Sequence, residues 1–197
     1  ADRQFINTFK PQFDTTVSIA GRVHPNDTSI LETAGLYYLS TGRKEKAADA
    51  FRTMKELSPD NPVAAAEYIR ILLFNGEWEN AVTESEEAFR KFDSEPGFLD
   101  FANTAEYQLK NYDRIIDNCS RMLLASPGDS AVFVSSWSTI GDMKHKLGDD
   151  KSAFKAYDTL RKQYPDYSPA LNNYAWFLAE NGKKLKKALA MSRKTVD

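Results

Sequence analysis

Apolar residues recur at helical spacing in short stretches along the chain, and glycine, serine and proline separate these stretches. Between Ser29 and Asn61, a first stretch ends at Gly42 and a second ends before Pro59. Spacings of three and four residues place apolar side chains on one helix face, and proline cannot continue a helix because it lacks an N–H group. The segment therefore predicts two amphipathic helices, with apolar positions Ile30, Leu31, Ala34, Tyr37 and Tyr38, then Ala47, Ala48, Phe51, Met54 and Leu57.

The same pattern predicts the fold class and the packing within each helix pair. No stretch alternates apolar and polar residues as a half-buried strand does, so the predicted fold class is all-α. Gly42 suits a helix end because glycine can adopt a positive φ. Gly35 and Ala47 are small where the two helices must approach closely, and we expect Phe51 to fill the space beside them.

Turn residues repeat along the chain with a period of 34 residues. Gly42 and Gly76 are 34 residues apart, whereas Gly76 and Gly148 are separated by 72 residues, which is two periods and four residues. Prolines and alanines at other positions show the same spacing and place a four-residue insertion between Pro127 and Gly141. A period of this length indicates an array of repeated helix pairs.

The period and its residue pattern resemble the tetratricopeptide repeat (TPR) family, in which each 34-residue unit is an antiparallel helix pair. In residues 28–61 the family positions are held by Leu31, Ala34, Gly35, Tyr38, Gly42, Ala47, Phe51 and Pro59. In residues 134–167 they are held by Trp137, Ile140, Gly141, Gly148, Ala153, Tyr157 and Pro165. The resemblance implies a right-handed α-solenoid, a TPR-like superhelix of antiparallel helix pairs.

The resemblance also divides the chain into the units of one continuous solenoid domain. We expect a partial N-terminal helix pair in residues 1–27, and a truncated fifth unit in residues 168–197. Four full units lie between them, in residues 28–61, 62–95, 96–129 and 134–167. The third is divergent, since Lys110, Ile115 and Cys119 stand where the family has glycine, alanine and an aromatic residue. Neither end has the polar capping helix that repeat arrays usually need, so we expect a fragment of a longer protein.

Charge and cysteine content restrict the classes of function. The 197 residues contain 26 basic and 28 acidic side chains, so there is no global electrostatic attraction for nucleic acid. One cysteine cannot form an intrachain disulfide, and with two histidines the sequence predicts no metal site and no cofactor. No phosphate-binding loop, zinc-protease helix or nucleophile elbow occurs, so we predict that the chain is not an enzyme.

The few residues that could carry chemistry have structural interpretations. Cys119 lies on the packing face of a predicted second helix, and we interpret it as a buried, inert thiol. Asp149 and Asp150 open a predicted helix, where acidic side chains cap the N-terminus. His24 lies at a helix end, where its role is structural, and His145 is interpreted as a solvated or groove-facing polar residue rather than a metal ligand.

Two charged clusters are interpreted as solvated helix faces. For the acidic cluster the alternative is a docking patch for a basic partner; its members are Glu77, Glu79, Glu84, Glu86 and Glu87. The basic cluster surrounds an apolar helical stripe of Leu185, Ala188, Leu189 and Met191, which favours a second helix with a wet basic face over a nucleic-acid site. Its members are Lys183, Lys184, Lys186, Lys187, Arg193 and Lys194.

The resemblance implies a ligand groove on the concave face, which the first helix of each unit lines. Carried onto this sequence, the groove positions hold Arg70, Phe74, Asp100, Thr104, Ser138, Asp142, His145, Asn172, Asn173 and Trp176. The family's best-defined groove grips a C-terminal carboxylate with Lys, Asn and Arg. Asn173 suits that role, but Ser138 and Asp142 stand where Lys and Asn are needed, so this sequence departs from the carboxylate clamp. The alternative interpretation is that several of these residues only pack.

The leading hypothesis is therefore a non-catalytic protein–protein interaction scaffold that binds a peptide or protein segment on the concave face. The alternative is a regulatory or substrate-docking arm of a larger enzyme whose catalytic domain is absent from this chain. A third hypothesis is weak self-association through the apolar end of the last helix, at Leu189, Met191 and Val196.

The sequence predicts no membrane-spanning segment, because its longest apolar runs are far shorter than the roughly 20 residues that a spanning helix needs. No signal peptide is visible, although the chain begins without Met. Both a cytoplasmic protein and an exported or membrane-tethered one fit the sequence.

Overall fold

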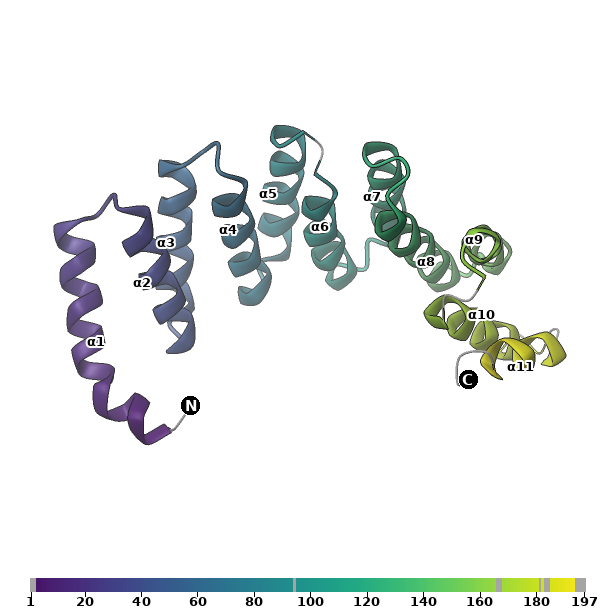
Figure 1. Cartoon of the computed structure of the whole chain (residues 1–197), viewed down its shortest axis with the longest axis horizontal. Coiled ribbons are helices and arrows are strands. Elements are labelled where there is room, and N and C mark those ends of the chain that lie inside the picture. The colour runs from purple at the N-terminus through teal and green to yellow at the C-terminus, as the bar shows by residue number, and fades with distance from the viewer. Residues whose placement is uncertain (1–2, 94, 166–167, 181, 183–184, 194–197) are drawn as a thin grey trace. The chain divides into compact units, whose positions relative to one another are not determined.

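A computed structural model describes residues 3–93, 95–165, 168–180, 182 and 185–193, and within them the secondary structure is entirely helical. The prediction of an all-α fold is confirmed. The helices, labelled in Figure 1, are α1 (Arg3–Val23), α2 (Thr28–Ser40), α3 (Lys44–Leu57), α4 (Pro62–Asn75), α5 (Trp78–Lys91), α6 (Pro96–Gln108), α7 (Tyr112–Ala125), α8 (Ser130–Lys146), α9 (Asp150–Gln163), α10 (Ser168–Glu180) and α11 (Leu185–Arg193).

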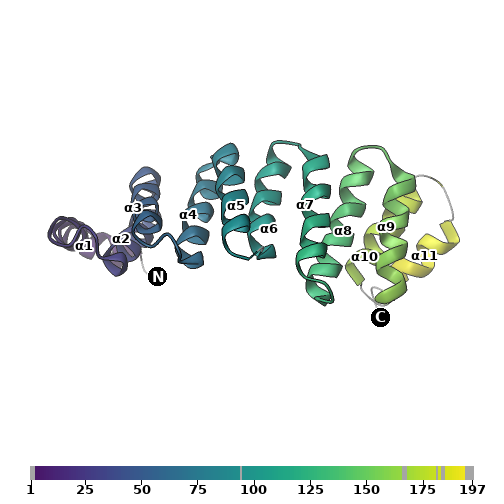
Figure 2. The same ribbon diagram turned by 90° about the horizontal axis from the view of Figure 1, so that it is seen from above.

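The chain forms two compact units, residues 1–88 and 89–197, and the boundary falls inside α5. The first unit holds α1 to α4 and most of α5, and the second holds the end of α5 and α6 to α11. Connections of a few residues make consecutive helices antiparallel neighbours, as Figure 2 shows for α6 and α7 and for α8 and α9.

Caps and turns explain where these helices begin and end. The side chains of Asp27, Asn61 and Asp129 each accept hydrogen bonds from two backbone N–H groups in the first turn of α2, α4 and α8. The turn inside each pair has a residue with positive φ, and Gly148 (79°) is an example. In the divergent unit, Lys110 adopts the same conformation with φ 61°, although a side chain makes it unfavourable.

The structure differs from the expectation at the N-terminus. In place of a helix pair within residues 1–27, a single helix, α1, runs without a break from Arg3 to Val23 and contains Pro11. The reason is that this stretch has no turn sequence comparable to the one at Gly42, and Pro11 alone does not end the helix. The helix-pair expectation for residues 1–27 is therefore wrong.

The four-residue insertion lengthens a helix rather than a loop. The α8 helix has 17 residues, whereas the other first helices, α2, α4, α6 and α10, have 13 or 14. Residues 130–133, which the repeat boundaries left between two units, form the first turn of α8, and Asp129 caps that turn. The insertion therefore leaves the turn at Gly148 in its expected place.

Each unit has its own apolar core. In the first unit, Phe51 is fully buried beside Met54, Ala64 and Ile71. As the sequence predicts, Phe51 lies against Gly35, where an added Cβ atom would come within 2.5 Å of the ring. The second unit has one cluster around Ile115 and Met143 and another around Tyr157, Tyr174 and Phe177.

Candidate functional site

The predicted groove residues all lie on first helices. Arg70 and Phe74 are on α4 in the first unit. The other eight are in the second unit: Asp100 and Thr104 on α6, Ser138, Asp142 and His145 on α8, and Asn172, Asn173 and Trp176 on α10. Four of these eight are joined by direct contacts, and they define the candidate site.

Asp142 connects the three helices α8, α9 and α10. Its carboxylate Oδ1 accepts a hydrogen bond from the Tyr157 hydroxyl on α9 and another, of 3.2 Å, from the Asn173 amide on α10. Burial raises the pKa of Asp142 despite these bonds, and burial together with the bond to Asp142 raises the pKa of Tyr157. Asp142 and Asn173 therefore bind each other rather than being free for a ligand, as the packing interpretation expects.

His145 holds the aromatic part of the site. Its Nδ1 atom lies 2.7 Å from Oδ1 of Asp150, and its ring lies on that of Phe177 with 3.8 Å between centroids. The Trp176 ring meets His145 edge-on, with 6.1 Å between centroids. His145 is thus half-buried and bonded instead of solvated, because the turn at Gly148 brings Asp150 back to it.

Trp176 is the large apolar side chain that this site presents to solvent. It is 57% exposed, although Phe177 and His145 support one side of it. Asn172 is exposed one turn before it, and Ser138 on α8 is half-buried. The site therefore offers an aromatic surface on a rigid support, with neutral polar groups beside it.

On α6, Asp100 and Thr104 lie on the same helix face, one turn apart. The Thr104 hydroxyl donates to the backbone oxygen of Asp100 at 3.0 Å, which leaves the Asp100 carboxylate out of that bond. Burial raises the pKa of Asp100. These two residues have no printed contact with the cluster around Asp142, so the structure joins only part of the predicted set.

In the first unit, both groove residues of α4 have partners of their own. Arg70 lies 3.2 Å from Glu67 one turn earlier. The Phe74 ring is 57% exposed, and the ammonium group of Lys44 lies 4.6 Å from its centroid.

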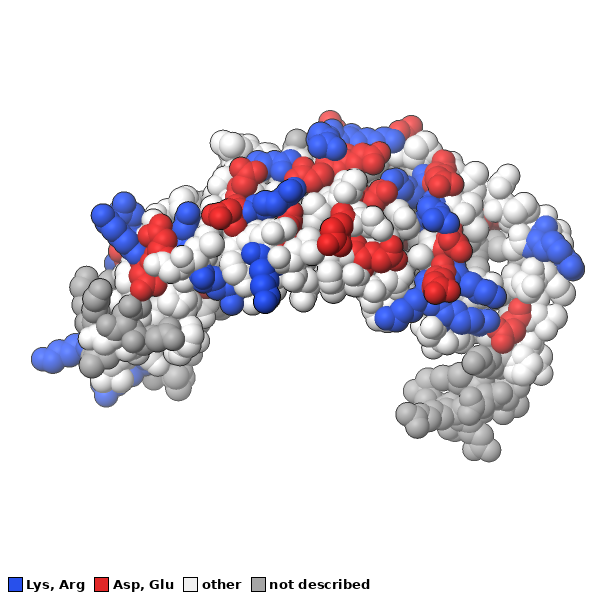
Figure 3. Space-filling view, turned by 180° about the vertical axis from the view of Figure 1, so that it is seen from behind, with Lys and Arg blue, Asp and Glu red and all other residues white. Residues whose placement is uncertain are grey.

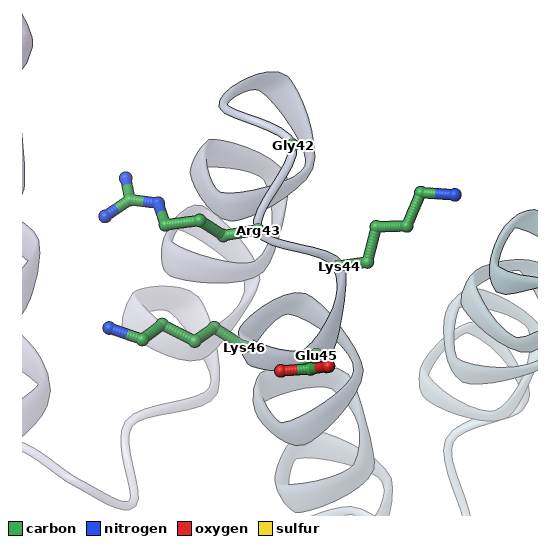
Figure 4. A pocket seen from close by; sticks show the side chains of 5 residues that line it. All are labelled: Gly42, Arg43, Lys44, Glu45 and Lys46. Atoms are coloured by element: carbon green, nitrogen blue, oxygen red, sulfur yellow. The ribbon is translucent and has the colours of Figure 1, made fainter.

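A separate cavity of about 350 Å³ lies at the turn between α2 and α3, and it was not foreseen from the sequence. Figure 4 shows its lining residues, with Arg43 and Lys46 pointing to one side and Lys44 to the other. Arg43 forms a 2.6 Å ion pair with Asp14 of α1 and lies over the Tyr37 and Tyr38 rings, whereas Lys46 lies over Tyr38. These cations therefore fasten helices together.

The remaining chemical candidates have structural roles where the structure describes them. Cys119 is buried, and burial raises the pKa of its thiol to about 12, so the predicted inert thiol is confirmed. The Asp149 side chain caps α9 by accepting from the Ser152 N–H, as predicted. His24 is exposed just after α1. In the described residues, no three His, Cys, Asp or Glu side chains form a group that could hold a metal ion.

The two charged clusters behave differently from each other. In the acidic cluster, Glu84 pairs with Lys55 of α3 and Glu77 accepts from Asn75 and Asn80, so these members join neighbouring elements. Figure 3 shows acidic and basic side chains interspersed over one face. Of the C-terminal basic cluster, Lys186 and Arg193 are exposed, and the other side chains lie outside the described set, as do those of Met191 and Val196. Leu189 is exposed.

Sequence reasoning missed three residues that build the site, namely Asp150, Tyr157 and Phe177. The available signal for Tyr157 is its position beside Gly141, because glycine on a first helix leaves room for a large ring. Asp150 and Phe177 have no comparable signal, since their contacts with His145 depend on how α9 and α10 pack on α8. Within the described residues, no helix is long and apolar enough to cross a membrane.

Comparison with solved structures shows the same fold. MamA superposes with a TM-score of 0.65 at 14% identity, covering 82% of this chain and 92% of that one. YrrB, described as a TPR protein with an unusual peptide-binding site, has a TM-score of 0.61 at 16% identity, covering 92% and 91%. PilF of Pseudomonas aeruginosa has a TM-score of 0.62 at 18% identity, covering 86% and 75%. No curated protein matches the sequence.

A sequence model described as tetratricopeptide repeat matches residues 39–196, which is most of the chain. The helix pairs, the turn residues inside each pair and the structural matches agree with this assignment. The chain belongs to the tetratricopeptide repeat family.

Proposed function

We propose that this chain is a non-catalytic scaffold whose second unit binds a peptide or protein segment on the face of α8 and α10. The TPR fold supports a protein–protein interaction scaffold in general. The location of the site on α8 and α10 is the finer part of the proposal.

One observation carries the location: Trp176 is more than half exposed, although it is held by neighbouring rings. An exposed tryptophan is a hydrophobic cost unless it has a partner, and tryptophan is enriched among the residues that dominate binding energy at interfaces. The His145–Asp150 bond and the Phe177 ring limit the freedom of the supporting side chains, which lowers the entropic cost of binding.

The neutral polar groups beside Trp176 suit a peptide backbone. Asn172 and Ser138 supply amide and hydroxyl groups, which can donate to and accept from main-chain carbonyl and N–H groups. The Asp142–Asn173 bond fixes α10 against α8, so that both rows of side chains keep their spacing.

Peptide display followed by affinity measurement tests this proposal. Peptides of random sequence are selected on the immobilised chain, and their Kd is then measured for the wild type, Trp176→Ala and Leu124→Ala. Leu124 is a matched control because it is 82% exposed but lies on a second helix, α7. We expect Trp176→Ala to weaken binding at least tenfold and Leu124→Ala to leave it unchanged. Equal affinity for Trp176→Ala and wild type contradicts the proposal.

A further inference from the structure

Charged residues are unevenly distributed along the first helices of the second unit. The α6 and α10 helices contain no Lys, Arg or His, and α8 has basic residues only in its last turn. The outward positions nearer the start of these helices include two carboxylates, Asp100 on α6 and Asp142 on α8. This part of the face is therefore acidic, although the whole chain is nearly neutral.

The Asp100 carboxylate lacks a compensating cation. Among the described residues, no hydrogen bond or ion pair reaches its side-chain oxygens, and only its backbone oxygen accepts a bond, from Thr104. The residue reaches the surface, and burial of part of the side chain raises its pKa. A partly desolvated carboxylate without a partner gains free energy when a cation binds to it.

Asp142 is bonded to neutral groups, the Tyr157 hydroxyl and the Asn173 amide. Lys146 and His145 lower its pKa from the same helix, but burial raises it by more. Both basic groups have other partners, since His145 bonds to Asp150 and Lys146 lies over the Tyr107 and Tyr112 rings. The negative charge of Asp142 is therefore only partly compensated.

We infer that the segment bound by this face carries a lysine or arginine that pairs with Asp100, next to a bulky apolar side chain that packs on Trp176. The inference rests on the proposed function and adds the chemical class of the ligand. A ligand carboxylate at the same place meets two carboxylates, whereas the nearest basic groups are engaged, and like charges at close range are repelled. The preference is thus opposite in charge to a carboxylate clamp.

Three synthetic pools of fluorescent ten-residue peptides test this ligand class. Each peptide has one Phe or Leu and one fixed residue, Lys, Gln or Glu according to the pool, at random separations in a neutral background. Their affinities are measured by anisotropy with the full chain and with Asp100→Asn, Trp176→Ala and Asp117→Asn. Asp117→Asn is the matched control, because it removes the same charge from an exposed site on the second helix α7.

We expect the Lys pool to bind the wild type at least fivefold more tightly than the Gln pool, and the Glu pool to bind most weakly. Asp100→Asn removes the preference for Lys, Asp117→Asn retains it, and Trp176→Ala weakens all three pools. If Trp176→Ala weakens binding but the pools bind alike, or if Asp100→Asn and Asp117→Asn behave alike, the charge inference is wrong and the proposed function stands. If no pool binds, or if Trp176→Ala has no effect, the proposed function fails and the inference with it.

Discussion

Gly141 of α8 lies directly against the ring of Tyr157 on α9: a Cβ atom added at Gly141 would be 2.6 Å from Tyr157 Cζ. Gly35 and Phe51 have the same relationship in the first unit. At the equivalent positions of the intervening repeats the sizes are reversed, with Ile69 and Ser85 in one and Asn103 and Cys119 in the other. Each repeat therefore fills the space between its helices once, from one side or the other.

Gly141→Ala should destabilise the second unit by about 1–3 kcal/mol, because a Cβ atom at this distance forces a buried ring or a helix to move. Urea unfolding followed by circular dichroism measures the change. Gly21→Ala in α1 is the control, since an added Cβ there contacts nothing within 4 Å and alanine favours helix. Equal effects of the two substitutions would show that the Gly141–Tyr157 contact is not tight.

Lys110→Gly should stabilise the second unit by about 1 kcal/mol. Lys110 has a φ of 61° at the turn where other repeats have glycine, and this conformation is strained for a residue with a side chain. Lys110→Ala is the control, because it removes the charge and keeps the Cβ atom. The urea midpoint should rise for glycine alone; an equal rise for alanine would assign the effect to charge.

Glu106 and Arg114 should respond in opposite directions to loss of charge. Glu106 is 1% exposed on α6, and its carboxylate pairs with Arg114 Nε at 2.5 Å and accepts from the Asn111 amide. Arg114→Ala leaves a buried charge without its partner and should cost about 2–3 kcal/mol, whereas Glu106→Leu places an apolar group at a buried position and should be neutral or stabilising. Urea unfolding of both variants checks this, and comparable losses of stability in both contradict it.

Asp100→Asn should stabilise the fold near pH 7 while it weakens ligand binding. Burial raises the pKa of Asp100 in the folded chain, so the folded state holds this proton more tightly than the unfolded state. The contribution of Asp100 to stability is therefore present below its unfolded pKa, about 4, and is lost as the pH rises through the folded pKa.

The measurement is the difference in urea midpoint between Asp100→Asn and wild type from pH 3.5 to pH 7. The difference should be smallest at pH 3.5 and should increase in favour of Asp100→Asn up to pH 7, with no such trend for Asp117→Asn. A difference independent of pH would show that the Asp100 carboxyl titrates alike in the folded and unfolded chain.

Local sequence signals predicted most of the fold, because each repeat is built from contacts close in sequence. The turn at Gly42 and the packing of Gly35 against Phe51 follow from residue size and backbone freedom alone. The prediction was wrong for α1, because a proline without further turn residues did not interrupt the helix. The extra turn of α8 was located but not assigned to a helix, since an insertion count does not say which element it lengthens.

The candidate site was predictable only in outline. The repeat register indicated Asp142, His145, Asn173 and Trp176, because positions recur along a helix face. It did not show that Asp142 and Asn173 bind each other, which depends on side chains from three helices meeting. The placement of Glu106 at a buried position was also missed, although Tyr38 and Leu72 at the same repeat position were a signal that it faces the core.

The central claim, that the second unit binds its ligand at Trp176, is tested most directly by indole N–H signals in nitrogen-15 NMR. The chain has three tryptophans, Trp78, Trp137 and Trp176, and a Phe substitution of each assigns its signal. On titration with a peptide selected on the wild-type chain, the account predicts that the Trp176 signal shifts in a saturable way, with a much smaller change at Trp78. A saturable shift at Trp78 with Trp176 unmoved would contradict it.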